Sequence, residues 1–256
     1  MTSKSRSRNC WAKYRRDCSK DISDEHLLSK ALFPDKIVYV SGFDWCEGEQ
    51  KQIGINSLVR KILCVKHNNL LSDSDNEAVK ALDLFRYEST GSAERQSNQG
   101  RIINGIFLEK WLVKTAINFS IGGNRHIGVG MNDSEVGHPS PYLLAVAFGD
   151  LNLSHGMGAY FLHPTGYYPY IPGEIIVMPI IKDDYIGGFY FGLRGQPVFL
   201  NLIPGTSPNV FNELGDFPLP IELKDARLEY RLDKIATVFK DGRMSMVRIH
   251  WPAVKP

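Results

Sequence analysis

Apolar residues recur at helical spacing in a segment that begins near Ser72. Ser74 and Glu77 stand at the spacing of a capping box, in which the two side chains satisfy the first backbone amides of a helix. The apolar positions that follow lie on one face of a helix and are Ala78, Ala81, Leu82 and Phe85. The pattern therefore predicts an amphipathic helix from about residue 72 to residue 85.

A second helical pattern starts at Asn104 or Gly105 and ends at Phe119. Glu109 and Lys110 fall outside its apolar stripe, so we expect both side chains to face outward. A tryptophan on such a stripe is typical of a packed core rather than of a functional site. The stripe consists of Leu108, Trp111, Leu112, Thr115, Ala116 and Phe119.

After residue 120 the pattern changes to short apolar runs bounded by Gly or Pro, which are typical of strands. The regular spacing of these runs favours an antiparallel sheet or sandwich. The Gly-rich segment 121–130 lacks the Gly-Lys-Ser/Thr ending of a phosphate loop, and we interpret it as an ordinary loop. We predict strands at 142–148, 158–162, 174–179, 186–191 and 196–203, with closing strands within 228–238 and 244–251.

Length and composition fit a globular protein of one large or two small domains. The chain has 256 residues, of which 43% are hydrophobic and 23% charged, close to the average for soluble proteins. No apolar run reaches the roughly 18 residues of a membrane-spanning helix, and no apolar signal region follows the basic start. We therefore expect a cytoplasmic protein that does not act in a membrane.

The distribution of cysteine changes this picture, because all four cysteines lie in the first 64 residues. In a reducing compartment such a grouping indicates a metal site more often than disulfides. The best tetrahedral zinc ligands are Cys10, Cys18, Cys64 and His67, with Cys64 and His67 at knuckle spacing. Seven residues separate Cys10 from Cys18, more than the usual two to four or so, and Cys46 could replace one of them. The alternative is a set of unrelated thiols.

A histidine next to carboxylates marks a second kind of chemistry in the same region. His26 can accept a proton near neutral pH, and Glu25 or Asp24 beside it can bind Mg²⁺ or Mn²⁺. An amide oxygen of Asn68 or Asn69 could complete the cation site or orient the histidine. A base for water and a cation for the developing charge are what phosphodiester hydrolysis needs.

Basic residues are concentrated at the start of the chain, although the formal net charge is only +2. The first twenty residues carry seven Lys and Arg residues against Asp17 alone. Such an arm suits a nucleic-acid phosphate backbone. The alternative is a solvated terminus without a ligand.

Segments 23–33 and 63–72, together with Asp75, resemble the HNH nuclease family, and the resemblance covers residues 10–85. It implies that His26 is the general base and that Glu25 or Asp24 binds the catalytic cation. It also places Asn68 where the family has a helix-borne His or Asn that binds metal, and His67 where the second zinc cysteine normally stands. Two departures from the family pattern are the wide Cys10–Cys18 spacing and the position of Asn56, the candidate for the middle asparagine.

The resemblance and the patterns together predict an α+β protein. Residues 1–85 would form a zinc-stapled ββα-metal (HNH-like) module with its basic arm, residues 86–100 a linker, and residues 101–256 a mostly antiparallel β-rich domain with one leading helix. The expected function is an endonuclease with structural Zn²⁺ and catalytic Mg²⁺ or Mn²⁺ that acts on nucleic acid, DNA rather than RNA. The resemblance also implies a role in bacterial defence. The alternatives are an inactive zinc-stapled nucleic-acid-binding protein, and a regulator whose β-rich domain senses a ligand or binds a protein partner.

Overall fold

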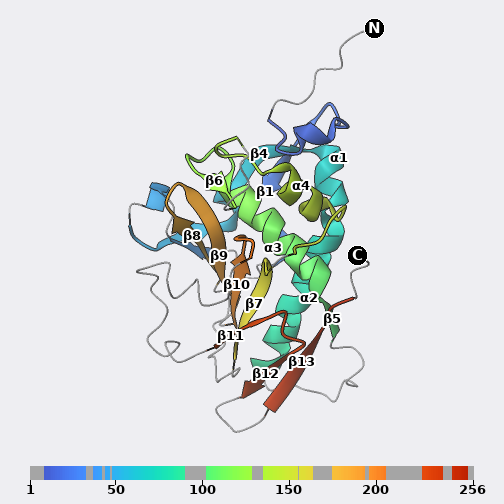
Figure 1. The fold of residues 1–256 in the computed structure, drawn as a ribbon, viewed down its shortest axis with the longest axis vertical. Helices are drawn as coiled ribbons and strands as arrows, with labels where there is room; N and C mark the ends of the chain where they lie inside the picture. Colours follow the sequence, from blue (N-terminus) through green and yellow to red (C-terminus); the bar gives the residue numbers. More distant parts are fainter. Residues whose placement is uncertain are drawn as a thin grey trace.

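A computed structural model of the chain shows a mixed α+β fold in which most strand pairs are antiparallel (Figure 1). The predicted basic arm up to residue 8 and residues 90–100 of the predicted linker lie outside the part of the chain that the structure describes. The described residues are 9–32, 37–41, 44–46, 48–89, 102–128, 135–154, 156–163, 175–193, 196–205, 227–238 and 244–252.

An eight-stranded sheet forms the largest layer, in the order β11-β7-β10-β9-β8-β2-β3, with β6 paired to β9. The predicted strands at 158–162, 174–179, 186–191 and 196–203 are confirmed as β7 to β10. Strand β2, from the N-terminal third, pairs in parallel with β8, so that third also contributes to the large sheet. The strands are β2 (Ile37–Val40), β3 (Lys51–Gly54), β6 (His126–Ile127), β7 (Gly158–His163), β8 (Ile175–Lys182), β9 (Tyr185–Leu193), β10 (Gln196–Asn201) and β11 (Arg227–Tyr230).

Two smaller sheets lie beside this layer. Strands β1 (Ile22–His26) and β4 (Val59–Cys64) form an antiparallel ribbon, and helix α1 (Val65–Leu70) follows β4 directly. The other sheet contains β12 (Lys234–Val238), β13 (Met244–His250) and β5 (Ile102–Asn104), with β5 parallel to β13. Four short 3₁₀ helices complete the N-terminal part: η1 (Lys13–Arg15), η2 (Lys30–Leu32), η3 (Asp44–Cys46) and η4 (Ile55–Ser57).

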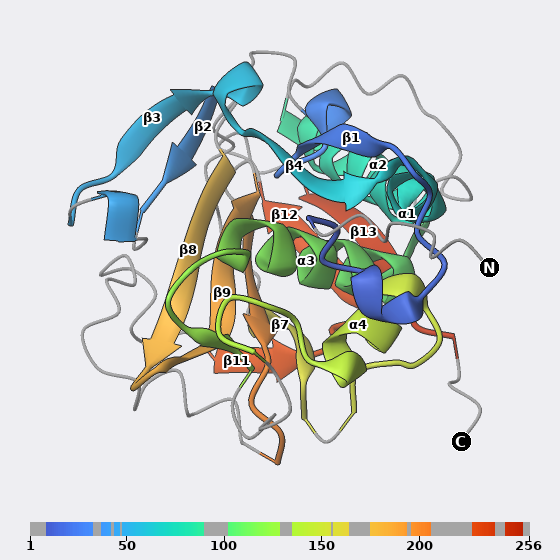
Figure 2. The same ribbon diagram turned by 90° about the horizontal axis from the view of Figure 1, so that it is seen from above.

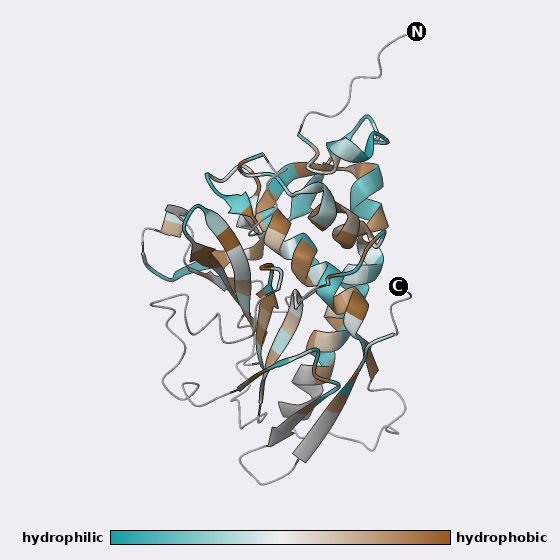
Figure 3. Ribbon diagram, viewed as in Figure 1, coloured by the Kyte–Doolittle hydropathy of each residue, from teal (hydrophilic) through white to brown (hydrophobic). Residues whose placement is uncertain are grey.

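Helix α3 (Gly105–Ser120) lies at the centre of the molecule, between the large sheet and the β1–β4 ribbon (Figures 1 and 2). The Asn104 side chain caps it by accepting hydrogen bonds from the backbone amides of Ile106 and Phe107. Most of its residues are buried, and Figure 3 shows hydrophobic positions along the helix. The expectation that Glu109 faces solvent was wrong, because α3 is covered on that side too, and Glu109 is only 2% exposed.

Helix α2 (Ser72–Ser89) confirms the predicted helix near residue 72 and continues into the segment expected to be a linker. It packs against α3. Helices that lie before and after residues 90–100 in the sequence are therefore in direct contact. Among the described residues, each helix is too short or too polar to cross a membrane.

Residues Pro141–Phe148 form helix α4, so the strand predicted at 142–148 was wrong. The Ser140 side chain accepts a hydrogen bond from the backbone amide of Leu143, and Pro141 occupies the first helical turn. Gly149 ends the helix with a φ of 81°, in the left-handed region that favours glycine. These capping signals outweigh the strand-like apolar run between them.

The cap of α4 gives a stability prediction. Ser140→Ala should lower the free energy of unfolding by about 1 kcal/mol, because the backbone amide of Leu143 loses its acceptor. Urea denaturation followed by circular dichroism measures the change. Ser57→Ala is the matched control, since Ser57 is exposed in η4. Equal stability of the two variants would show that the cap does not stabilise α4.

One connected core joins the two parts of the sequence. Trp11 and Leu63 from the N-terminal part belong to the same cluster of buried residues as Trp111 and Phe191. The Trp111 and Phe191 rings lie 6.1 Å apart between α3 and β9. The segment before residue 85 and the segment after residue 101 are therefore packed against each other rather than separated.

Candidate metal centre and its surroundings

The predicted zinc ligands Cys10, Cys18, Cys64 and His67 lie together beside the N-terminus of α1, with one ligand atom from each within 4.8 Å of the others. Cys46, the alternative ligand, is buried elsewhere and does not belong to this cluster. All four cysteines are free thiols. The structure thus brings together the ligand set that the sequence favoured.

The spacing of the four side chains fits a tetrahedral metal ion. The Nδ1 atom of His67 lies 3.4 Å from the sulfur of Cys10, 3.7 Å from that of Cys18 and 3.3 Å from that of Cys64. Ideal zinc bond lengths and a tetrahedral angle separate such sulfur and nitrogen atoms by about 3.6 Å. The cluster could therefore hold a metal ion such as zinc.

The protonation of His67 also suits a ligand. Its Nε2–H donates to Oδ1 of Asp17 at 2.7 Å, which leaves Nδ1 facing the three sulfurs. Burial lowers the pKa of His67, although Asp17 opposes the shift, so the ring is neutral as a metal ligand must be. A carboxylate behind a ligating imidazole fixes the ring and raises its basicity.

The surroundings of the thiols favour the binding of a cation. Burial raises the pKa of Cys10 to about 12, and burial also raises the pKa of Cys18. Burial acts the same way on Cys64, but hydrogen bonds from Ser19 and from the backbone at His67 outweigh it and lower the pKa. Because a metal binds the thiolate form, its charge would compensate the burial of these sulfurs.

Local structure explains how the wide Cys10–Cys18 spacing is accommodated. The 3₁₀ helix η1 lies between the two cysteines, and Arg16 follows it with a φ of 63° in the left-handed region. This turn brings the chain back so that both sulfurs face the same point. On the other side, Cys64 is the N-cap residue of α1, and His67 lies in its first turn.

Helix α4 packs directly on the metal centre. The Phe148 ring meets the His67 ring edge-on at 5.3 Å and lies 5.6 Å from the Trp11 ring. The Arg15 guanidinium lies over the same Phe148 ring and forms an ion pair with Asp150. A helix from the later part of the sequence therefore shields the cluster.

The proposed base and its neighbouring carboxylates occupy different environments. His26 ends β1 opposite Val59 and is half-buried. Its pKa is lowered mainly by burial and further by the positive charge of Lys30. Asp24 lies at the irregularity of β1, with its side chain 70% exposed and 3.8 Å from the Lys61 ammonium. The two side chains are thus open to solvent to different degrees.

Glu25, by contrast, points into the protein. It is 3% exposed and accepts hydrogen bonds from Lys114 at 2.9 Å and from Asn118 at 3.3 Å. Burial raises the pKa of Glu25, and the Lys114 charge opposes this shift. The carboxylate is therefore engaged by α3.

Lys114 is the centre of a buried ionic network that sequence reasoning missed. Its ammonium also contacts both carboxylate oxygens of Asp75 in α2, at 3.0 and 2.8 Å. Asn118 accepts from the indole of Trp11 at 3.1 Å, which links the network to the loop of Cys10. The available signal was a polar pair, Lys114 and Asn118, four residues apart and therefore on one face of the helix.

The asparagines expected near the catalytic cation do not belong to the Cys₃His cluster. Asn68 is half-buried in α1, and its side chain makes no hydrogen bond to any described residue. Asn69 and Asn56 are exposed. Within the described ranges, Cys10, Cys18, Cys64 and His67 are the one group of three or more such ligands, and it includes neither Glu25 nor His26.

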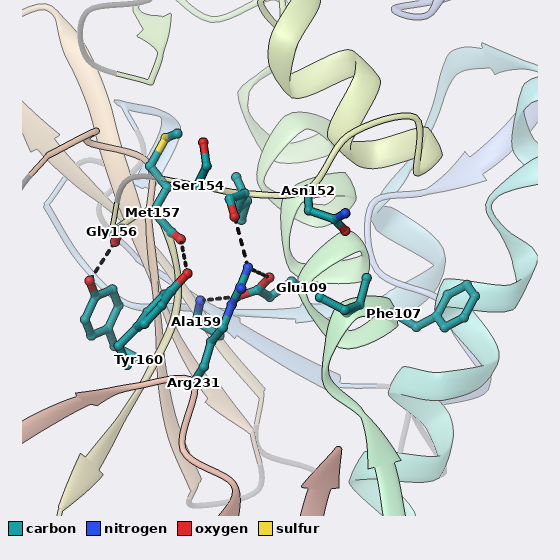
Figure 4. Close-up of polar contacts among 12 residues, drawn as sticks. Phe107, Glu109, Asn152, Ser154, Gly156, Met157, Ala159, Tyr160 and Arg231 are labelled. Atoms are coloured by element: carbon teal, nitrogen blue, oxygen red, sulfur yellow. Dashed lines mark hydrogen bonds and ion pairs between the residues drawn. The ribbon is translucent and has the colours of Figure 1, made fainter. Parts of the chain in front are cut away.

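A second buried ion pair, between Glu109 and Arg231, was also missed (Figure 4). Arg231 donates to both oxygens of Glu109, at 3.0 and 2.8 Å, and the backbone amide of Ala159 donates to Glu109 at 2.9 Å. Arg231 has a φ of 47°, and its guanidinium also donates to the carbonyl of Leu153. These bonds join α3 to β7 and β11, which is a structural role.

Tyrosines and histidines are concentrated within residues 155–170, and most of them lie outside the described residues. Tyr160 is described, and its hydroxyl donates to the carbonyl of Gly156 at 2.6 Å (Figure 4). His163 ends β7, and the structure describes its backbone but not its side chain. The other members, His155, Tyr167, Tyr168 and Tyr170, also lie outside the described ranges.

Comparison of the chain with protein-family models, with curated proteins and with solved structures finds no match. The class of protein therefore follows from the fold and the site alone. The chain is an α+β protein with mostly antiparallel sheets and an N-terminal Cys₃His cluster that could hold a metal ion such as zinc.

Proposed function

We propose that the chain is a metal-dependent HNH-type endonuclease that hydrolyses phosphodiester bonds, in DNA rather than RNA. One observation carries the proposal: the Cys₃His cluster anchors α1 directly behind the β1–β4 ribbon, and His26 ends the first strand of that ribbon. Two antiparallel strands followed by a helix, with zinc at the helix start, are the arrangement that the sequence resemblance implies.

His26 would act as the general base in this proposal. Its ring is half-buried rather than enclosed, so that water can reach it. Burial and the Lys30 charge lower its pKa, which keeps the imidazole neutral at pH 7 and able to accept a proton from water. The positive charge of Lys30, which contributes to this shift, also favours the approach of a phosphate.

The zinc would have a structural role, and Cys10, Cys18, Cys64 and His67 would hold it. A hard cation such as Mg²⁺ or Mn²⁺ would supply charge stabilisation at the phosphate. Glu25 does not fit such a cation in this structure, because Lys114 and Asn118 already occupy its carboxylate. Asp24 is the carboxylate beside His26 that remains open to solvent.

The engagement of Glu25 favours a second candidate function. A zinc-stapled module that binds nucleic acid without cleaving it would need the same cluster and the same basic surface, but no cation ligands. In that case Glu25 would stabilise the structure through its ion pair with Lys114 and would not bind a catalytic cation.

A nicking assay separates the two functions. Supercoiled plasmid is incubated with protein and Mg²⁺ or Mn²⁺, and we expect His26→Ala to reduce the nicking rate by at least about a hundredfold, because the base is lost. His250→Ala, at an exposed histidine on β13, is the matched control and should nick like the wild type.

Two results would count against catalysis by His26. Equal nicking by the wild type and His26→Ala would show that another group, or a contaminant, cleaves the plasmid. Absence of nicking by either protein, with retention of plasmid binding in a gel-shift experiment, would leave the binding module as the function.

A further inference from the structure

A cavity of about 130 Å³ lies where the C-terminal end of α3 meets the β1–β4 ribbon and the large sheet. Arg60 of β4 and Trp45 of η3 line one side, and Arg125 lines it from the loop after α3. Apolar residues of α3, β8 and β9, among them Phe119 and Ile186, form the remainder. The cavity is thus built from both parts of the sequence.

The charge of the cavity is positive. Its described lining residues include two arginines and no acidic side chain. Arg60 is exposed and reaches the carbonyl of Ile121 at 3.5 Å, and Arg125 donates to the side chain of Asn124 at 3.2 Å. A guanidinium presents five donors in a planar fork, which suits the oxygens of a phosphate.

The loop that carries Arg125 is held in place by backbone contacts. The amide of Gly122 donates to the carbonyl of Gly137 at 3.0 Å, and the amide of Gly137 donates to the carbonyl of Arg125 at 2.9 Å. Gly137 has a φ of 69°, and a Cβ there would lie 2.5 Å from the carbonyl oxygen of Gly123. The geometry of this wall therefore depends on glycine and is fixed by the fold.

The size of the cavity suits one planar ring. Apolar cavities of about 150 Å³ accept a benzene-sized ligand. The Trp45 side chain is partly exposed at the cavity, and an indole face stacks on aromatic bases. A ring next to a phosphate is the chemistry of a nucleotide.

We propose that this cavity binds a nucleotide, with the base against Trp45 and the apolar wall and the phosphate at Arg60 and Arg125. The nucleotide is either a free mononucleotide or one unit of a single strand. The proposal rests on the cavity and not on catalysis. Arg60 lies directly opposite Glu25 in the β1–β4 ribbon, so the cavity adjoins the ribbon that carries His26.

Isothermal titration calorimetry with the full chain tests the proposal. The probes are the nucleoside 5′-monophosphates, a short single-stranded oligonucleotide and inorganic phosphate. We expect a nucleotide or the oligonucleotide to bind more tightly than phosphate, and Arg60→Gln/Arg125→Gln to weaken that binding at least about tenfold. Trp45→Ala should weaken it at least about fivefold. Lys61→Gln is the matched control, because Lys61 neighbours Arg60 on β4 but does not line the cavity.

Binding of mononucleotides would identify a free ligand, and binding of the oligonucleotide alone would identify a strand; either supports the proposal. No binding of any nucleotide, binding no tighter than that of phosphate, or the same affinity in the double variant as in Lys61→Gln would overturn it. Thermal melting confirms that each variant is folded. His26→Ala should retain full nucleotide affinity, so that failure of the nuclease proposal and failure of this one remain separate results.

Discussion

Replacement of Cys64 by serine is expected to abolish stable metal binding and to destabilise the whole protein. Cys64 supplies one of the sulfurs, and it also stands at the junction of β4 and α1. In small zinc modules, metal binding contributes about 10–16 kcal/mol that is largely coupled to folding, so loss of a ligand removes a major part of the stability. A strong chelator should have the same effect on the wild-type protein.

Metal analysis and circular dichroism measure this effect. The purified wild type should contain about one zinc per chain, as one Cys₃His cluster requires. Cys46→Ser is the matched control, because Cys46 is a buried thiol outside the cluster and its replacement should leave the metal content unchanged. A wild-type protein without bound metal, or a Cys64→Ser variant that retains it, would show that the four side chains are not a metal centre.

The buried network around Lys114 gives the second large effect. Lys114→Met should lower the free energy of unfolding by about 3–5 kcal/mol, because Glu25 and Asp75 would then face each other without their cation. Urea denaturation gives the value. Lys110→Met is the matched control, since Lys110 lies one turn earlier on α3, where its ammonium lies over the Phe107 ring and is attracted to Asp150 but does not join the Glu25–Asp75 network.

A further variant tests the electrostatic origin of that loss. Combining Lys114→Met with Glu25→Gln and Asp75→Asn removes both negative charges, and we expect it to regain part of the lost stability. If Lys114→Met and Lys110→Met destabilise the protein equally, the loss reflects packing rather than the ion pairs.

The metal ligands could be predicted because their signal is local. A cysteine three positions before a histidine, at the start of a helix, limits how the two side chains can point, and Cys64 and His67 follow that rule. Only three other cysteines could join them, and the sequence left Cys46 open as a replacement for Cys10 or Cys18. The turn at η1 accommodates the wide Cys10–Cys18 spacing. Strands β7 to β10 could also be predicted, because short apolar runs bounded by Gly or Pro are local patterns.

Partners that are distant in sequence could not be predicted in this way. Glu109 was expected to face solvent because nothing nearby in the chain signals Arg231, which lies 122 residues later. Glu25 was expected to bind a cation because nothing near it in the sequence signals its partner, Lys114, which belongs to a helix in the other part of the chain. Helix α4 was mistaken for a strand although its signals, Ser140, Pro141 and Gly149, were present, because the apolar run between them lacks a polar face.

The indole of Trp11 makes the metal centre a part of the whole molecule's cooperativity. Trp11 follows the metal ligand Cys10, and its indole donates to Asn118 in the last turn of α3, while its ring packs beside Phe148 of α4. Unfolding of the segment around Cys10 would therefore remove the Trp11 hydrogen bond from α3 and expose residues that the Trp11 ring covers. Calorimetry of the intact chain should accordingly record a single transition whose midpoint follows metal occupancy, and a cut near residue 90 would leave two fragments that each expose half of one core.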